Sequence, residues 1–223
     1  MTSNKKLELA LQDLFKQKEY SKVVFEITSQ TNEQERSAFL CNLLGLSRVS
    51  NNNKNIDALN LAIRDFKSGY LKEKNTNHAL DSLANFITTS VLLIDLEKNY
   101  KFDFTEILEF YKSSEKLCSN HKIIHLAMAM VYRRLNDSNK LAFHFDKIIK
   151  SKNFNADDLC NYGYWRCFGK EWSQADFLKY GSFVDENLQM LPEDKLSKIS
   201  QKTGPKIRIG FLSSDILQGH SIT

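Results

Sequence analysis

The sequence predicts an all-α fold of repeated helix pairs, followed by the opening strand of a truncated α/β domain. Helix-like patterning continues through most of the 223 residues, and the chain holds only 2 prolines. Small or apolar residues recur in similar settings, with separations of 35, 49, 34 and 34 residues, at Val23, Ala58, Ile107, Leu141 and Ala175. Three of these separations match the roughly 34-residue period of stacked helix-turn-helix units. The pattern changes only after Gly204-Pro205, which indicates a second kind of structure.

The clearest repeat unit spans residues 159–183. One face of its first helix carries Leu159, Tyr162 and Gly163. A turn over residues 169–172 follows, and Ala175 is placed where the two helices approach closely. Segments that begin at Leu14 and Val131 have the same layout. The longer separation predicts an insertion of about 15 residues, placed around Lys67–Asn77.

This layout resembles the tetratricopeptide repeat family over roughly residues 5–190. The first-helix position that is usually small in that family is filled here by Leu11, Gly45, Ala129 and Gly163. A small residue on the second helix lets the first helix pack against it, and an aromatic side chain fills the gap to the next pair. Aromatic residues such as Tyr162 and Trp172 are therefore expected in the core.

Composition and charge exclude several function classes. Lys plus Arg number 31 against 27 Asp plus Glu, and the net charge of +4 is dispersed, so no nucleic-acid partner is expected. The four cysteines form no CxxC pair, which is typical of reduced thiols in a cytoplasmic protein. No apolar run approaches the length of a membrane span, and no signal peptide is evident.

Two histidines stand four residues apart, His121 and His125, as a metal site on a helix could require. The segment HKIIH lacks the adjacent glutamate of a zinc protease, however, and no third ligand is evident. We therefore expect solvated or capping histidines and no bound metal. His78 and His144 carry no signal of their own.

A short apolar run, Ile207–Leu212, follows the Gly-Pro pair and leads into Ser213-Ser214-Asp215 and then His220. Such a run is typical of a buried parallel strand at the start of an α/β domain. The predicted domains are a helical repeat domain over 1–191, a linker over 192–205 and the start of the α/β domain over 206–223.

The segment KIRIGFLSSD followed by GHS resembles the start of the catalytic region in the O-GlcNAc transferase and SPINDLY-like glycosyltransferases. In that family tetratricopeptide repeats precede a two-lobed catalytic unit of the GT-B type. Two departures are Ile216, where the family usually has an aromatic residue, and the four residues between Asp215 and His220, where three are common.

The resemblance implies transfer of a sugar, with N-acetylglucosamine expected, from a UDP-sugar to Ser or Thr of a protein acceptor. His220 would lie on the acceptor side of the cleft, as a general base or as a positioning group. The UDP-sugar would be held mainly by the second lobe, so these 223 residues are expected to bind no cofactor and to be inactive alone.

The helical part would then recruit protein or peptide acceptors. Related transferases grip a peptide backbone with a ladder of asparagines, whose amides pair with both N–H and C=O groups. The corresponding positions are Leu9, Leu43, Ala127 and Asn161, so Asn161 is the single candidate for peptide binding. The alternative function is a tetratricopeptide-repeat adaptor for protein–protein interaction, without catalytic activity.

Overall fold

The computed structural model describes residues 3–97 and 103–151, together with residues 154, 155, 158, 161, 162, 178, 181 and 182. The described part is all-α and contains no strand. Its helices are α1 (Ser3–Lys16), α2 (Tyr20–Gln30), α3 (Ala38–Asn51), α4 (Ile56–Lys72), α5 (Asn77–Leu96), α6 (Thr105–Cys118), α7 (Lys122–Arg134) and α8 (Ser138–Lys150). All of them belong to the first of two compact units, Met1–Gly181 and Ser182–Thr223.

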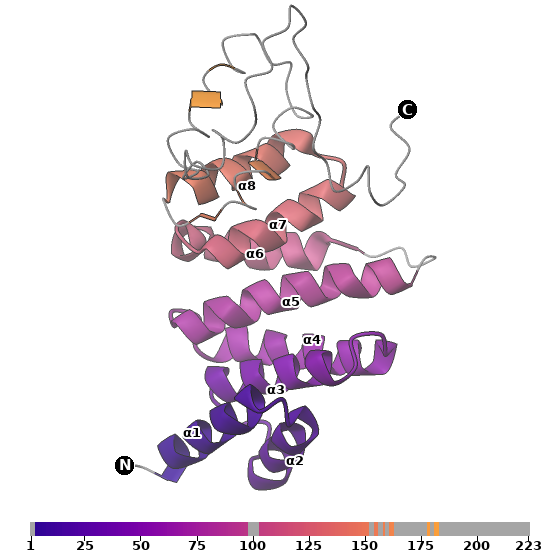
Figure 1. The fold of residues 1–223 in the computed structure, drawn as a ribbon, viewed down its shortest axis with the longest axis vertical. Helices are drawn as coiled ribbons and strands as arrows, with labels where there is room; N and C mark the ends of the chain where they lie inside the picture. Colours follow the sequence, from indigo (N-terminus) through magenta and orange to yellow (C-terminus); the bar gives the residue numbers. More distant parts are fainter. Residues whose placement is uncertain are drawn as a thin grey trace, which may run out of the picture. The chain divides into compact units, whose positions relative to one another are not determined.

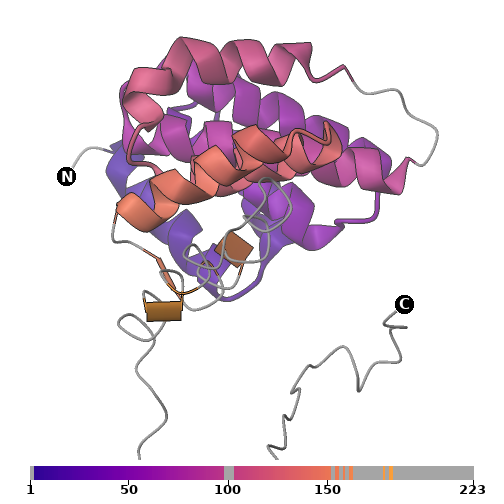
Figure 2. The same cartoon turned by 90° about the horizontal axis from the view of Figure 1, so that it is seen from above.

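The helices are stacked in chain order (Figure 1). Most sequence neighbours pack against each other, namely α1–α2, α2–α3, α3–α4, α4–α5 and α7–α8, whereas α5 and α6 touch only slightly; α5 also packs on α3 and α7. Figure 2 looks along the direction of stacking and shows the helices laid over one another. The arrangement is compatible with a helical repeat, as the sequence predicts.

The predicted repeat positions fall in the same place within successive helix pairs. Near the starts of α2, α4, α6 and α8 lie Val23, Ala58, Ile107 and Leu141, respectively. Three of these side chains are buried, and Ala58 is half-buried. The four described repeat positions therefore lie at equivalent places in alternate helices, and the fifth, Ala175, lies outside the described residues.

Short polar turns separate the helices, and their side chains satisfy the first free backbone N–H groups of the next helix. Ser37 Oγ accepts from Leu40 N–H at 3.2 Å, and Asn55 Oδ1 accepts from Ala58 N–H at 2.9 Å. Thr76 and Asp137 cap α5 and α8 in the same way. Residues 52–55 thus form the turn between α3 and α4.

The α1–α2 and α7–α8 turns share one backbone geometry. Lys18 and Asn136 have positive φ angles of 62° and 54°. In the first turn Lys18 N–H donates to Phe15 C=O at 2.9 Å and Glu19 N–H donates to Leu14 C=O at 3.0 Å. The second turn repeats both bonds, from Asn136 and Asp137, at 3.2 and 3.0 Å. Both are Schellman motifs, which satisfy the last carbonyls of the preceding helix.

The insertion predicted around Lys67–Asn77 does not form a separate segment between two helices. Residues 67–72 complete α4, and only residues 73–76 separate it from α5. The extra length of this repeat lies largely in the helices, since α4 has 17 residues and α5 has 20. Helical periodicity continues through both, so nothing in the local pattern marks the added turns as an insertion.

Two clusters of buried apolar side chains hold the stack together. A small one joins α1, α2 and α3 and contains Leu11, Val23, Ile27, Leu40, Leu43 and Leu44. The larger one runs from α3 to α8 and includes Phe66, Tyr70, Phe86 and Ile124, with Tyr162 packed against it. Tyr162 is thus half-buried against the core, whereas Trp172, also predicted in the core, lies outside the described residues.

Helix α5 is the central element of the larger cluster. Its length and mean hydropathy of 1.4 over 18 residues would suffice to cross a membrane, contrary to the sequence expectation that no segment comes near this limit. Of that window, 61% is buried inside the fold. The apolar composition of α5 is thus explained by its packing against α3, α4 and α7.

The linker over 192–205 and the strand expected over 206–223 lie outside the described residues. The boundary after residue 191 lies there too. These assignments therefore remain predictions.

Candidate binding site between α2, α3 and α4

The described helices form an open groove of about 290 Å³ between α2, α3 and α4. Its lining consists of Ser21, Val24, Arg48, Asn51, Ala58 and Leu61. The walls are largely apolar, and the Ser21 hydroxyl donates to Asn51 Oδ1 at 3.1 Å at the rim. An apolar side chain of a partner could occupy such a groove.

One apolar side chain that lines the groove, Leu61 on α4, is 36% exposed. Phe25 on α2 and Ile56 on α4 are also exposed, at 66% and 40%, on helices that form the groove. Isolated exposed apolar residues are common on protein surfaces, but an exposed one in a groove can contact a partner.

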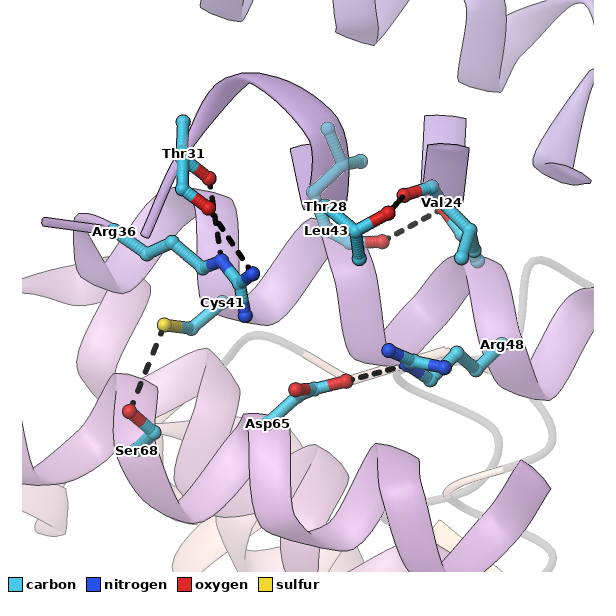
Figure 3. A network of polar contacts seen from close by, with 10 residues as sticks. Val24, Thr28, Thr31, Arg36, Cys41, Leu43, Arg48, Asp65 and Ser68 are labelled. Carbon is cyan, nitrogen blue, oxygen red and sulfur yellow. Dashed lines mark hydrogen bonds and ion pairs between the residues drawn. The ribbon is translucent and has the colours of Figure 1, made fainter. Parts of the chain in front are cut away.

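Arg48, which lines the groove, forms an ion pair with Asp65 (Figure 3). Arg48 Nε on α3 donates to Asp65 Oδ2 on α4 at 2.7 Å, and the two side chains are 16% and 6% exposed. Burial raises the pKa of Asp65, while Arg48, Arg64 and Arg36 favour its ionised form and limit the rise. The pair therefore joins α3 to α4 and restrains the side chain of Arg48.

A second set of polar contacts lies at the N-terminal end of α3 (Figure 3). Arg36 donates from Nε to Thr31 Oγ1 and from Nη2 to Thr31 C=O, both at 3.2 Å. Cys41 Sγ donates to Ser68 Oγ at 3.8 Å. Burial raises the pKa of the Cys41 thiol above its usual value, so at neutral pH it stays protonated and is a poor nucleophile.

A cluster of buried ionisable side chains lies between α6, α7 and α8. His125 and His144 are 2% and 1% exposed, and their Nδ1 atoms are 3.0 Å apart. The Tyr132 ring stacks on His144, and the edge of Tyr111 meets it. Burial lowers the pKa of both histidines, that of His144 to about 3. Burial also raises the pKa of Tyr111 to about 12, so the cluster is uncharged near neutral pH.

The prediction of solvated or capping histidines is wrong for both residues. His121 occupies the position before α7 but makes no side-chain cap hydrogen bond, and its Nε2 instead lies 3.3 Å from Asp81 Oδ1 on α5. His125 is instead buried and paired with His144, so the solvated alternative is wrong for it. Among the described residues no group of three or more His, Cys, Asp or Glu side chains could hold a metal ion.

The sequence-predicted site residues do not come together in the described part. Asn161 is helical and exposed, which leaves it accessible to a peptide. Of the other ladder positions, Leu9 is 46% exposed, whereas Leu43 and Ala127 are buried in the two cores. A continuous ladder over these positions is therefore not formed. His220 lies outside the described residues.

The groove and the histidine pair were both missed by sequence reasoning. The groove depends on the separation between α2 and α4, which no short motif encodes. His144 stands 19 residues from His125, and its only sequence signal is its place among buried positions of α8: Leu141, Phe145 and Ile148. Comparison with known proteins adds nothing here, because no family model, curated protein or solved structure matches the chain.

Proposed function

We propose that this chain is the helical, acceptor-recruiting region of a protein O-glycosyltransferase, with the start of the catalytic domain at its C-terminus. The observation that carries the proposal is the order of parts. A stack of helix pairs occupies residues 3–150, and the segment KIRIGFLSSD, which resembles the opening of such catalytic domains, begins at Lys206.

In this proposal the helices bind protein acceptors or support the catalytic unit. Helical repeats offer extended surfaces for protein partners. The groove between α2, α3 and α4 has apolar walls and a polar rim, which suits an apolar side chain of an acceptor. Asn161 would offer an amide to the acceptor backbone.

His220 would act on the acceptor side of the sugar-transfer site. An imidazole can accept the proton of a Ser or Thr hydroxyl, or orient that hydroxyl by a hydrogen bond. The resemblance places the UDP-sugar site mainly in a second lobe, so the donor would be held by residues other than those of the helical array.

The test uses the product of the complete reading frame that encodes this chain. It is incubated with radiolabelled UDP-N-acetylglucosamine and a host protein extract, and both protein-bound label and released UDP are measured. We expect label on Ser or Thr, and a large loss of label with His220→Ala. His78→Ala, at an exposed histidine of α5, is the matched control and should leave transfer unchanged. Absence of both label and UDP release would refute the glycosyltransferase proposal.

A second candidate is an adaptor that binds a protein partner without catalysis. The groove favours the adaptor function, because an exposed apolar residue such as Leu61 suits the binding of a partner and requires no catalytic reaction. Ala58→Leu would fill the groove, and Ala10→Leu, on the exposed part of α1, is the matched control. An adaptor should lose partner binding with Ala58→Leu while no UDP-sugar is consumed by either variant. A glycosyltransferase should consume the donor and lose transfer only to acceptors that use the groove.

A further inference from the structure

The contacts of His125 determine which of its nitrogen atoms carries the proton. Its Nε2 lies 3.2 Å from the carbonyl oxygen of Ser119, which can only accept a hydrogen bond. Nε2 must therefore be the donor. In the neutral ring Nδ1 then has a free lone pair and acts as an acceptor.

This assignment fixes the tautomer of His144 as well. The two Nδ1 atoms are 3.0 Å apart, and His125 Nδ1 is the acceptor, so His144 Nδ1 must carry the proton. The result is a directional chain in which His144 donates to His125 and His125 donates to Ser119. It links α8 to α7 and then to the turn after α6.

Protonation of the histidines disturbs this series of hydrogen bonds in two ways. A proton on Nε2 of His144 keeps the bond but places a charge against the Tyr132 and Tyr111 rings, in a site that is 1% exposed. A proton on Nδ1 of His125 points two N–H donors at each other and breaks the bond. Neutral rings therefore fit the closed arrangement, and two protonated rings do not.

The charged groups around the pair do not compensate for this cost. From α8, Lys147 adds a like charge that disfavours protonation of both rings. From the start of α7, His121 acts in the same direction on His125, and Asp81 of α5 is engaged with His121. From α6, burial keeps the Tyr111 and Cys118 side chains neutral, with pKa values of about 12, while Glu115 is exposed. Tyr132 is neutral too, and Asp137 pairs with Lys140.

We propose that the His125–His144 pair is an acid-sensitive latch, which holds α8 on α7 when both rings are neutral and releases α8 when they are protonated. The inference is independent of the proposed glycosyltransferase function. Because α8 packs on α7, its release would uncover the face of α7 that it covers.

Linkage gives the direction and size of the effect. A histidine whose pKa is lowered on folding contributes stability that is present above its unfolded pKa of about 6.5 and is lost as the pH falls below that value. With a pKa of about 3 for closed His144, opening at pH 5.0 should be favoured about 30-fold relative to neutral pH. Protonation of His125 would add to this.

The test is hydrogen–deuterium exchange of the whole chain at pH 7.5 and 5.0, with rates corrected for the intrinsic pH dependence of amide exchange. Protection of α8 amides should fall at least about 10-fold more than that of α3 amides. His125→Leu/His144→Phe replaces both rings by apolar groups and should abolish this difference. His78→Gln, at an exposed histidine, should leave it unchanged. Equal loss in α3 and α8, or persistence of the difference in the double variant, would overturn the latch.

Nitrogen-15 spectra of the wild-type histidine rings provide a second measurement, in case the double variant does not fold. At pH 7.5 they should show His125 protonated at Nε2 and His144 at Nδ1. At pH 5.0 both rings should become cationic in the fraction with an open α8. Other tautomers at pH 7.5, or neutral rings in an open α8 at pH 5.0, would refute the proposal.

Discussion

At the level of single residues, the approach of α3 to α4 depends on Gly45. A Cβ at this position would lie 2.5 Å from the Phe66 ring, which is itself fully buried. We expect Gly45→Ala to lower the free energy of unfolding by about 1–3 kcal/mol through overpacking, although alanine favours a helix. Urea denaturation measures this change.

Gly181 provides the matched control, because it is also helical and an added Cβ would meet no atom within 4 Å. Gly181→Ala should be neutral or slightly stabilising. If both substitutions have the same effect, helix propensity and not packing decides the role of Gly45.

Lys18 is the second residue whose conformation matters. Its φ of 62° lies in the left-handed region, which costs a lysine about 1 kcal/mol or more compared with glycine. Lys18→Gly should therefore raise the free energy of unfolding by about 0.5–1 kcal/mol, as measured by urea denaturation. Asn136→Gly, at the equivalent turn, should have a smaller effect because asparagine tolerates this region better. A loss of stability with Lys18→Gly would contradict this account.

Sequence patterns predicted the small residues at helix contacts better than they predicted the buried histidines. The small first-helix position was located correctly at Gly45 and Ala129, because close helix packing imposes a residue type at a fixed spacing. The contact between His125 and His144 was not predictable, because it depends on how α7 and α8 lie against each other. Histidine is compatible with capping, solvent and core, so its type alone does not select among them.

At the level of elements, the Arg48–Asp65 pair joins α3 to α4. Arg48→Met should cost about 3–5 kcal/mol of unfolding free energy, since it leaves Asp65 with much of its charge compensation removed. The double variant Arg48→Met/Asp65→Leu should recover most of this loss, because no unpaired carboxylate remains buried.

A double-mutant cycle by urea denaturation measures the coupling between the two side chains. Lys67→Met/Glu106→Leu is a useful comparison, because that ion pair is more exposed, with side chains 29% and 50% accessible. Its coupling should be at most about 1 kcal/mol. Similar coupling in both pairs would mean that burial does not control the strength of the Arg48 contact.

The helices themselves were more predictable than the groove they form. Capping residues such as Asn55 and Thr76 mark helix starts locally, and the four described repeat positions lie at equivalent places in alternate helices. The lengths of α4 and α5 were not evident, because extra turns continue the same amphipathic pattern. The groove required knowledge of how three helices are spaced, which no single segment carries.

At the level of the whole molecule, the two cores predict that stability is distributed along the stack. Leu11, 1% exposed, belongs to the cluster of α1, α2 and α3. Leu11→Ala should cost about 2–5 kcal/mol locally. Hydrogen exchange should show this loss in α1 and α2 and little change in α7 and α8, because helical arrays are coupled mainly through neighbouring elements.

Ile124→Ala, in the larger cluster, is the converse variant. It should loosen α7 and α8 and leave protection in α1 and α2 nearly unchanged. Uniform loss throughout the described helices in either variant would indicate a single cooperative unit.

The Schellman turns at Lys18 and Asn136 place equivalent residues 118 positions apart, and the same offset relates Leu11 to Ala129 and Val23 to Leu141. The first and last described helical hairpins therefore share the same turn at equivalent positions. A chimera that carries residues 129–148 in place of 11–30 should keep the turn, and any loss of docking would then be due to the side chains at the hairpin surface.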